Sequence, residues 1–254
     1  MKSTALTLNG APVLGKFGKG LNGARSLSFG TSGGRNCNPG CAYHPRSTSA
    51  HAAPDDRRCY AHTVENSARR PQLLAKLQRH ESLDPCAVLE RAAGQLDRHG
   101  WRIPWFRFCT FGAMPEPVDC TPEFVLLLRW FIGKLRAVGT PVHLPVETAR
   151  KATHYRRILA GIDVIVRESC GSPRRWRTAP VACSFVAGSM QSTPRERIAE
   201  AKRTARLRAA ATGRIVKVCP AVSSQHLNTK STAAKCGGCT LCAEDVDIVY
   251  PVHA

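Results

Sequence analysis

Four cysteines near the C-terminus have a spacing that suits metal binding. Cys236, Cys239 and Cys242 follow one another at intervals of three positions, and Cys219 precedes them in a Cys-Pro pair. Three thiolates at this spacing surround one small volume, and the two glycines after Cys236 allow the tight backbone path that this requires. We interpret the quartet as the ligands of an iron–sulfur cluster. Zinc is the alternative, with His226 as a further candidate ligand.

A second group of cysteines lies near the N-terminus. Cys37 and Cys41 are separated by three residues, and Cys59 follows after a longer segment. Three thiolates can hold three irons of a [4Fe–4S] cluster and leave the fourth iron open for a ligand, which cluster-based chemistry needs. The zinc alternative would use the same cysteines with His44 or His62.

The charge of the chain favours a polyanionic partner. Its 254 residues include 37 Lys and Arg against 18 Asp and Glu, a formal charge of +19. Such a surplus favours DNA, RNA or a phosphorylated small molecule. One basic stretch between two predicted strands suits phosphate contact with base stacking, although a solvated loop is the alternative. Its candidate nucleic-acid ligands are Arg174, Arg175, Trp176 and Arg177.

The elements that must position these residues alternate between helix and strand. We predict helices over 70–99, with a break at Asp84-Pro85, and over 122–138, 149–160 and 194–211. Strands are predicted over 27–29, 105–111, 142–146, 164–168, 181–186, 215–219 and 247–252. This order is typical of parallel βαβ units. We therefore predict an α/β fold with six or seven strands: an incomplete (β/α) barrel, with an open doubly wound sheet as the alternative.

Two helices are marked by strong start and stop signals. Thr121 and Thr193 can each cap a helix whose first position is proline, and Glu196 completes a capping box with Thr193. Gly139 and Gly213 can end these helices.

The later of these helices is strongly basic. Its apolar stripe is Ile198, Ala201 and Ala205, so most of its cations should face solvent, either as a nucleic-acid surface or only as a solvated one. These cations are Arg195, Arg197, Lys202, Arg203, Arg206 and Arg208.

Two acidic residues follow predicted strands. Glu147 directly follows the strand at 142–146, and Glu168 is the last residue of the strand at 164–168. Both candidate folds place functional groups at the C-terminal ends of their strands, so these carboxylates are candidate catalytic residues. Helix caps or ion-pair partners are the alternative.

The chain divides into two predicted regions. Residues 1–218 would form the partial barrel, with the N-terminal cysteine loop at 36–62, and residues 219–254 would form the cluster-binding segment and the last strand. No apolar run reaches the roughly 18–20 residues that span a bilayer, and we find no secretory signal, so we expect no membrane partner. Twelve cysteines in such a chain favour metal ligation in a reducing cytoplasm.

The N-terminal cysteines resemble those of the radical SAM superfamily, in which C-x3-C-x2-C follows the first strand of a (β/α) barrel. This chain keeps the C-x3-C as Cys37 and Cys41, and its third cysteine is displaced to Cys59. The lead-in SLSFGTSGGRNCNPGC, the Cys-Tyr-Ala at 59–61 and the terminal CGGCTLC also resemble an uncharacterised family of phage and prophage proteins.

These resemblances imply a function. Radical SAM proteins hold the methionine amino group of S-adenosylmethionine with a Gly-Gly-Glu-Pro segment, which Gly112, Glu116 and Pro117 echo. Gly112, Glu116 and Tyr60 are therefore candidate cofactor-binding residues, and Glu116 is also a candidate catalytic residue. The implied protein is an iron–sulfur enzyme of the host cytoplasm. It would have one or two [4Fe–4S] clusters, a reducing electron donor and a nucleic acid or nucleotide substrate. The alternative is a non-enzymatic nucleic-acid-binding protein stabilised by zinc or clusters.

Overall fold

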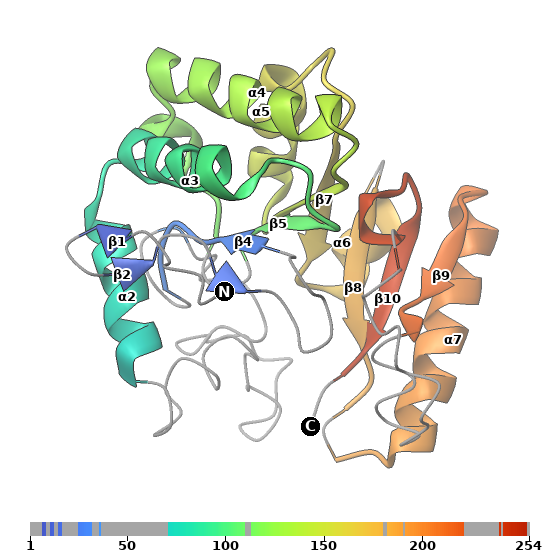
Figure 1. Cartoon of the computed structure of the whole chain (residues 1–254). Coiled ribbons are helices and arrows are strands. Elements are labelled where there is room, and N and C mark those ends of the chain that lie inside the picture. Colours follow the sequence, from blue (N-terminus) through green and yellow to red (C-terminus); the bar gives the residue numbers. More distant parts are fainter. Residues whose placement is uncertain are drawn as a thin grey trace.

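The computed structural model describes residues 7–8, 11–12, 15–16, 25–31, 36, 71–109, 113–179, 182–189, 191–220, 239 and 241–252. Strands β1 (Thr7–Leu8) and β2 (Ala11–Pro12) form an antiparallel pair. The remaining strands are β3 (Gly15–Lys16), β4 (Arg25–Leu27), β5 (Phe106–Phe108), β6 (Val142–Val146), β7 (Ile165–Cys170), β8 (Cys183–Ala187), β9 (Val216–Val218) and β10 (Asp247–Pro251). They form one sheet in the order β3-β4-β5-β6-β7-β8-β10-β9 (Figure 1).

The sheet confirms the predicted α/β class. Apart from β3, which is antiparallel to β4, every neighbouring pair is parallel, so seven strands run in one direction. From β4 to β8 the strands lie side by side in chain order, as in a barrel, whereas a doubly wound sheet reverses direction near its middle. Among the described strands no pairing joins β3 or β4 to β9. This open, progressive order is compatible with a partial barrel.

Helices α3 to α7 pack on one side of this sheet, and six helices are described in all. They are α2 (Pro71–Ser82), α3 (Pro85–His99), α4 (Pro122–Ala137), α5 (Ala149–Ile158), α6 (Pro173–Thr178) and α7 (Pro194–Thr212), with short 3-10 turns η2 (Pro117–Asp119) and η4 (Leu241–Ala243). Helices α3 to α5 lie over the first half of the sheet, and α7 lies beside β8, β9 and β10 (Figure 1). No helix in the described ranges is long and apolar enough to cross a membrane.

The predicted helix ends are confirmed by their hydrogen bonds. The Thr121 hydroxyl accepts a bond from the backbone N–H of Phe124 at 3.2 Å and so caps α4. Thr193 and Glu196 form a reciprocal capping box at the start of α7. Gly213 ends α7 in the left-handed conformation, with φ 67°, which glycine adopts without strain.

The two faces of the sheet differ in chemistry because side chains alternate along each strand. Leu27, Phe108, Leu144 and Val166 point to the side of helices α3 to α5 and form the main apolar core. The opposite side, which we call the inner face, carries a polar residue at a central position of five strands. These residues are Ser26, Arg107, His143, Arg167 and Ser184.

The phenol of Tyr250 on β10 is buried. Burial raises the pKa of this group, the Cys242 and Cys219 sulfurs raise it further, and the charge of Arg107 opposes them.

The last strand lies inside the sheet, between β8 and β9. Because β9 and β10 are parallel, the chain must return from the C-terminal end of β9 to the opposite edge before β10 begins. The described part of this return, 241–246, lies on the inner face, where Arg167 donates to carbonyls of Leu241 and Glu244. Residues 219–254 thus supply an internal strand of the sheet.

Candidate functional site

The described residues include ten of the sixteen residues of the predicted site. Glu116, Glu147, Glu168, the Arg-Trp stretch and three C-terminal cysteines are described. Six predicted ligands lie outside the described residues: Cys37, Cys41, Cys59, Tyr60, Gly112 and Cys236.

Lys151 brings two of the predicted acids together. Its side chain is fully buried. Its Nζ atom lies 3.2 Å from Glu147 Oε2 and 3.2 Å from Glu116 Oε1. Glu147 follows β6, Lys151 lies in the first turn of α5, and Glu116 precedes η2. Sequence reasoning did not single out Lys151, although its i,i+4 spacing from Glu147 is the signal that could have found it.

The same lysine holds the start of the N-terminal cysteine segment. Its Nζ donates to the carbonyl oxygen of Met114 at 2.7 Å and to that of Asn36 at 2.6 Å. Asn36 directly precedes Cys37 in the chain. The backbone at Asn36 is therefore fixed beside the C-terminal ends of β5 and β6, which is the end where (β/α) proteins carry their functional groups.

Glu147 has the properties of a proton-transfer group. Its side chain is 20% exposed. Burial raises the pKa of its carboxyl to about 7, although Lys151 acts in the opposite direction. A carboxyl that titrates near neutrality can both accept and donate a proton under working conditions.

We expect Glu147→Gln to flatten the pH dependence of stability. The folded protein holds this proton more tightly than the unfolded chain, so Glu147 lowers stability as pH rises from about 4.5 to about 7. The whole effect is at most about 3 kcal/mol. Urea unfolding at pH 5 and pH 8 measures it, with Glu90→Gln on the exposed side of α3 as the matched control. If the free energy of unfolding changes between pH 5 and pH 8 by the same amount in Glu147→Gln as in the wild type, Glu147 titrates normally.

Glu168 lies beside Glu147 in the same open pocket. The pocket has a volume of about 200 Å³, and its wall includes Gly171, Ser172 and Arg175. Strand β7 continues two residues beyond Glu168 to Cys170, so this acid lies near the C-terminal end of the strand but is not its last residue, contrary to the prediction. Its carboxylate is 1% exposed and binds the Arg175 guanidinium through both oxygens, with one contact of 2.6 Å. The pocket therefore joins a protonatable carboxyl with one held by an arginine.

The Arg-Trp stretch lies in helix α6, at a place where no helix was predicted. The Trp176 ring is 3% exposed, stacks on Phe185 and lies 4.9 Å below the Arg208 guanidinium carbon. In this arrangement the Trp176 ring is not accessible to a base, because it is buried. Arg175 is bound to Glu168, whereas Arg174 and Arg177 are exposed.

Three of the four C-terminal cysteines gather on the inner face. Cys219, Cys239 and Cys242 share one apolar cluster with Ile248 and Tyr250. The Cys242 sulfur lies 3.3 Å from the Tyr250 hydroxyl. Within the described ranges no three His, Cys, Asp or Glu side chains stand close enough to hold a metal ion. The fourth predicted ligand, Cys236, lies outside those ranges.

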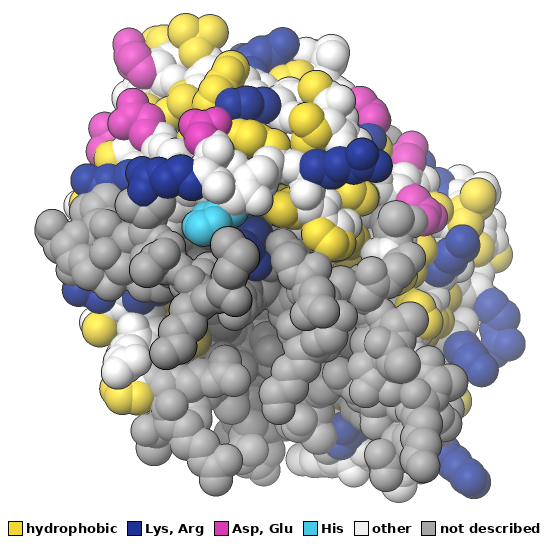
Figure 2. Space-filling model, viewed as in Figure 1, with side chains coloured by type: hydrophobic (Ala, Val, Ile, Leu, Met, Phe, Trp, Pro, Cys, Tyr) yellow, Lys and Arg dark blue, Asp and Glu magenta, His cyan; other side chains and the backbone are white. Residues whose placement is uncertain are grey.

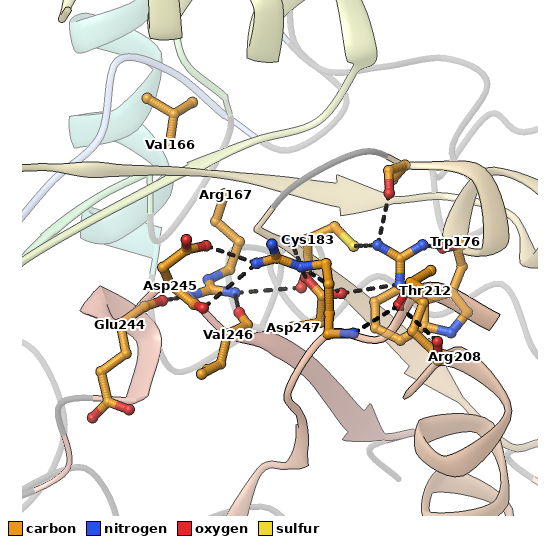
Figure 3. Close-up of polar contacts among 12 residues, drawn as sticks. Val166, Arg167, Trp176, Cys183, Arg208, Thr212, Glu244, Asp245, Val246 and Asp247 are labelled. Carbon is orange, nitrogen blue, oxygen red and sulfur yellow. Dashed lines mark hydrogen bonds and ion pairs between the residues drawn. The ribbon is translucent and has the colours of Figure 1, made fainter. Parts of the chain in front are cut away.

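Arg167 connects this cysteine segment to the sheet. Val166 and Arg167 point to opposite sides of β7, and the Arg167 side chain reaches the turn that precedes β10 (Figure 3). Its guanidinium is fully buried. It donates to the carbonyls of Glu244 at 2.6 Å and Cys242 at 3.4 Å, and also to that of Val246.

The charge of Arg167 fits a thiolate-bound metal nearby. No carboxylate of the described residues pairs with it, and its Nε atom has no hydrogen-bond partner. Burying a cation without a counter-charge is unfavourable. A metal centre held by four thiolates carries net negative charge, and it would offset this cost. The donor set fits an iron–sulfur cluster or zinc equally well.

The described geometry thus has two parts. Lys151, Glu147 and Glu168 form a strand-end site, and Arg167 anchors the cysteine segment on the inner face. Comparisons with protein-family models, with curated proteins and with solved structures gave no match, so the functional argument rests on the residues of this chain.

Proposed function

We propose that this chain is an iron–sulfur enzyme of radical-SAM-like type that acts on a nucleic acid or nucleotide. The observation that carries the proposal is the hydrogen bond from Lys151 to the carbonyl of Asn36. It fixes the chain one residue before Cys37, at the carboxyl ends of β5 and β6 and beside two acids. The segment that carries Cys37, Cys41 and Cys59 would therefore start at the end of the sheet where (β/α) enzymes act, and a cluster bound by these cysteines would lie near that end.

The strand-end residues have distinct roles in this proposal. Glu147 would move a proton to or from the substrate, since its pKa of about 7 permits both directions. Glu168, held by Arg175, would stay in place as an acceptor in the same pocket. Glu116 pairs with Lys151 and Arg150, and in this proposal it would receive the cofactor's amino group, as the resemblance implies. Bound S-adenosylmethionine, with an electron donor, would supply the radical chemistry.

The C-terminal quartet would hold an auxiliary iron–sulfur cluster, with zinc as the alternative metal. Support comes from the shared cluster of Cys219, Cys239 and Cys242 and from the uncompensated charge of Arg167. Because the segment lies across the inner face before β10, a metal there would also tie β9 to β10.

Metal content tests this proposal directly. The full chain purified without oxygen should be brown and contain iron and sulfide in matching amounts. Cys239→Ser and Cys242→Ser should each lose part of that iron, because each removes one ligand of the C-terminal site. Cys86→Ser, at a partly buried position on α3, is the control and should lose none. Colourless protein that contains only zinc would favour the non-enzymatic alternative.

The enzymatic part has its own readout in the same preparation. Reduced protein should convert S-adenosylmethionine to 5′-deoxyadenosine, and Cys41→Ser should abolish that product while the C-terminal iron is kept. A brown protein that releases none would be a passive cluster protein.

A further inference from the structure

Half of the net charge of the chain lies in one fifth of its length. Residues 171–220 contain eleven Lys and Arg but only two acids, Glu196 and Glu200, whereas the whole chain has a formal charge of +19. This segment comprises α6, β8, α7 and β9. Some of its cations form ion pairs inside the fold, and others face solvent.

The inward cations already have partners in the fold. Arg175 pairs with Glu168, and Arg208 and Arg214 both pair with Asp247. These residues stabilise the packing of α6 and α7 on the sheet, so they do not contribute to an outer binding surface.

The outward cations of α7 form a line. Arg195, Lys202 and Arg206 are exposed, and no acidic side chain of the described residues pairs with them. They stand at i, i+7 and i+11, which places them within about 20° of one direction on a helix with 100° per residue. With a rise of 1.5 Å per residue they are spaced about 10 Å and 6 Å along the axis. We call these three residues the α7 stripe.

The rest of the helix leaves the stripe accessible. On this side of the helix, Ala199 lies between Arg195 and Lys202, and Ala210 lies one turn beyond Arg206. Both are exposed, and their short side chains do not cover the cations. The buried residues Ile198, Ala201 and Ala205 lie about 60–120° around the helix from Arg195 and pack toward the sheet. In the space-filling view, Lys and Arg side chains gather along the side of the molecule where α7 lies (Figure 2).

The geometry points to a nucleic-acid backbone as the occupant of the α7 stripe. Cations about 6–10 Å apart on one line match a chain of phosphates, and contacts of this kind fix a strand without reading its bases. The buried Trp176 does not stack on a base at this surface. Because contacts to phosphates do not read base edges, we expect little sequence preference.

The stripe also leads toward the strand-end pocket. Arg195 lies in the first turn of α7, which follows the C-terminal end of β8. A nucleic-acid strand bound along α7 would therefore run toward the edge of the sheet where Glu147 and Glu168 lie. This inference rests on the nucleic-acid part of the proposed function and locates that partner.

The test compares two charge reversals of equal size. Lys202→Glu with Arg206→Glu changes the stripe, and Arg98→Glu with Arg102→Glu changes two exposed arginines at the end of α3 and after it. The probe is a labelled 20-nucleotide RNA, with DNA of the same sequence, and binding is measured by anisotropy at several salt concentrations. We expect the stripe variant to bind at least tenfold more weakly and with a shallower salt dependence, and the control less than threefold. Circular dichroism melts verify that both variants fold.

Each outcome decides the matter. Equal losses in the two variants would mean that only total charge counts, and the stripe would be rejected. It would also be rejected if the wild-type chain binds anionic lipid vesicles through these residues but not RNA or DNA. If RNA binding depends on the stripe in a protein without iron, the inference stands and the enzymatic proposal fails. If iron and 5′-deoxyadenosine are found without RNA or DNA binding, the enzymatic proposal stands and the inference about the α7 stripe fails.

Discussion

Replacing Lys151 with methionine should lower the free energy of unfolding by about 3 kcal/mol at neutral pH. The buried Nζ atom serves four oxygens, namely the carboxylates of Glu147 and Glu116 and the carbonyls of Met114 and Asn36. Breaking a buried ion pair by removing one partner costs about 3–5 kcal/mol, and carbonyls left without a donor add to it. Both acids are about one fifth exposed, so the lower end of that range applies.

The pH dependence distinguishes this account from a simple packing loss. Without Lys151 the pKa of Glu147 should rise above its present value of about 7, because the charge that lowers it is gone. The variant should therefore lose more stability at pH 8 than at pH 6, and adding Glu147→Gln should remove much of that difference. Urea unfolding of the single and double variants measures both effects.

Lys134→Met is the matched control. Lys134 pairs with Asp97 at 2.8 Å, but their side chains are 38% and 54% exposed. A solvent-exposed pair contributes about 1 kcal/mol or less, and the cation–π contacts of Lys134 with Trp101 and Trp130 add about 1 kcal/mol, so this change should cost less than Lys151→Met. If Lys151→Met is no more costly than Lys134→Met, Lys151 does not hold the strand-end site together.

The elements that the sequence predicted well are those with local signals. Strand β6 has the predicted bounds, because its apolar residues alone mark a buried strand. The Thr-Pro starts of α4 and α7 also depend on neighbouring residues only. Helix α6 was missed, although Ser172 before Pro173 is the same kind of cap, and the Ser172 side chain does accept from Arg175 N–H.

What the sequence could not reveal depends on distant pairings. Strand β10 was expected as the last strand, but its place between β8 and β9 follows from hydrogen bonds that no local pattern records. The buried state of Arg208 likewise depends on Asp247, 39 positions away. In the candidate site, strand-end position pointed to Glu147 and Glu168, whereas Trp176 was misplaced because its burial against Arg208 is a tertiary contact.

Replacing Asp247 with alanine should be at least as costly as the loss of Lys151, about 3–5 kcal/mol. Asp247 begins β10 and is fully buried. Its Oδ2 atom lies 3.0 Å from Arg208 Nε, and both carboxylate oxygens lie 3.2 Å from Arg214 Nε (Figure 3). Its Oδ1 atom also accepts a hydrogen bond from the backbone N–H of Cys183 at 3.0 Å. A single carboxylate thus joins β10 to β8, to α7 and to the turn before β9.

The cost arises because the arginines stay when the carboxylate leaves. Arg208 has no exposed surface, and it would keep its bonds to the carbonyls of Trp176 and Ala179 but lose its only acidic partner among the described residues. Arg214 would lose less, since Asp245 holds its other nitrogen at 2.7 Å. Combining Asp247→Ala with Arg208→Met should therefore recover part of the lost stability, because an apolar side chain needs no counter-charge.

A double-mutant cycle on Asp247 and Arg208 measures this coupling by urea unfolding. Asp163→Ala provides the exposed counterpart, since Asp163 pairs with Arg136 but its side chain is 80% exposed, and it should change stability by less than about 1 kcal/mol. A coupling energy near zero would mean that the two charges do not stabilise each other. A value above about 2 kcal/mol would show that this ion pair, rather than the cysteine segment alone, holds the last strand in the middle of the sheet.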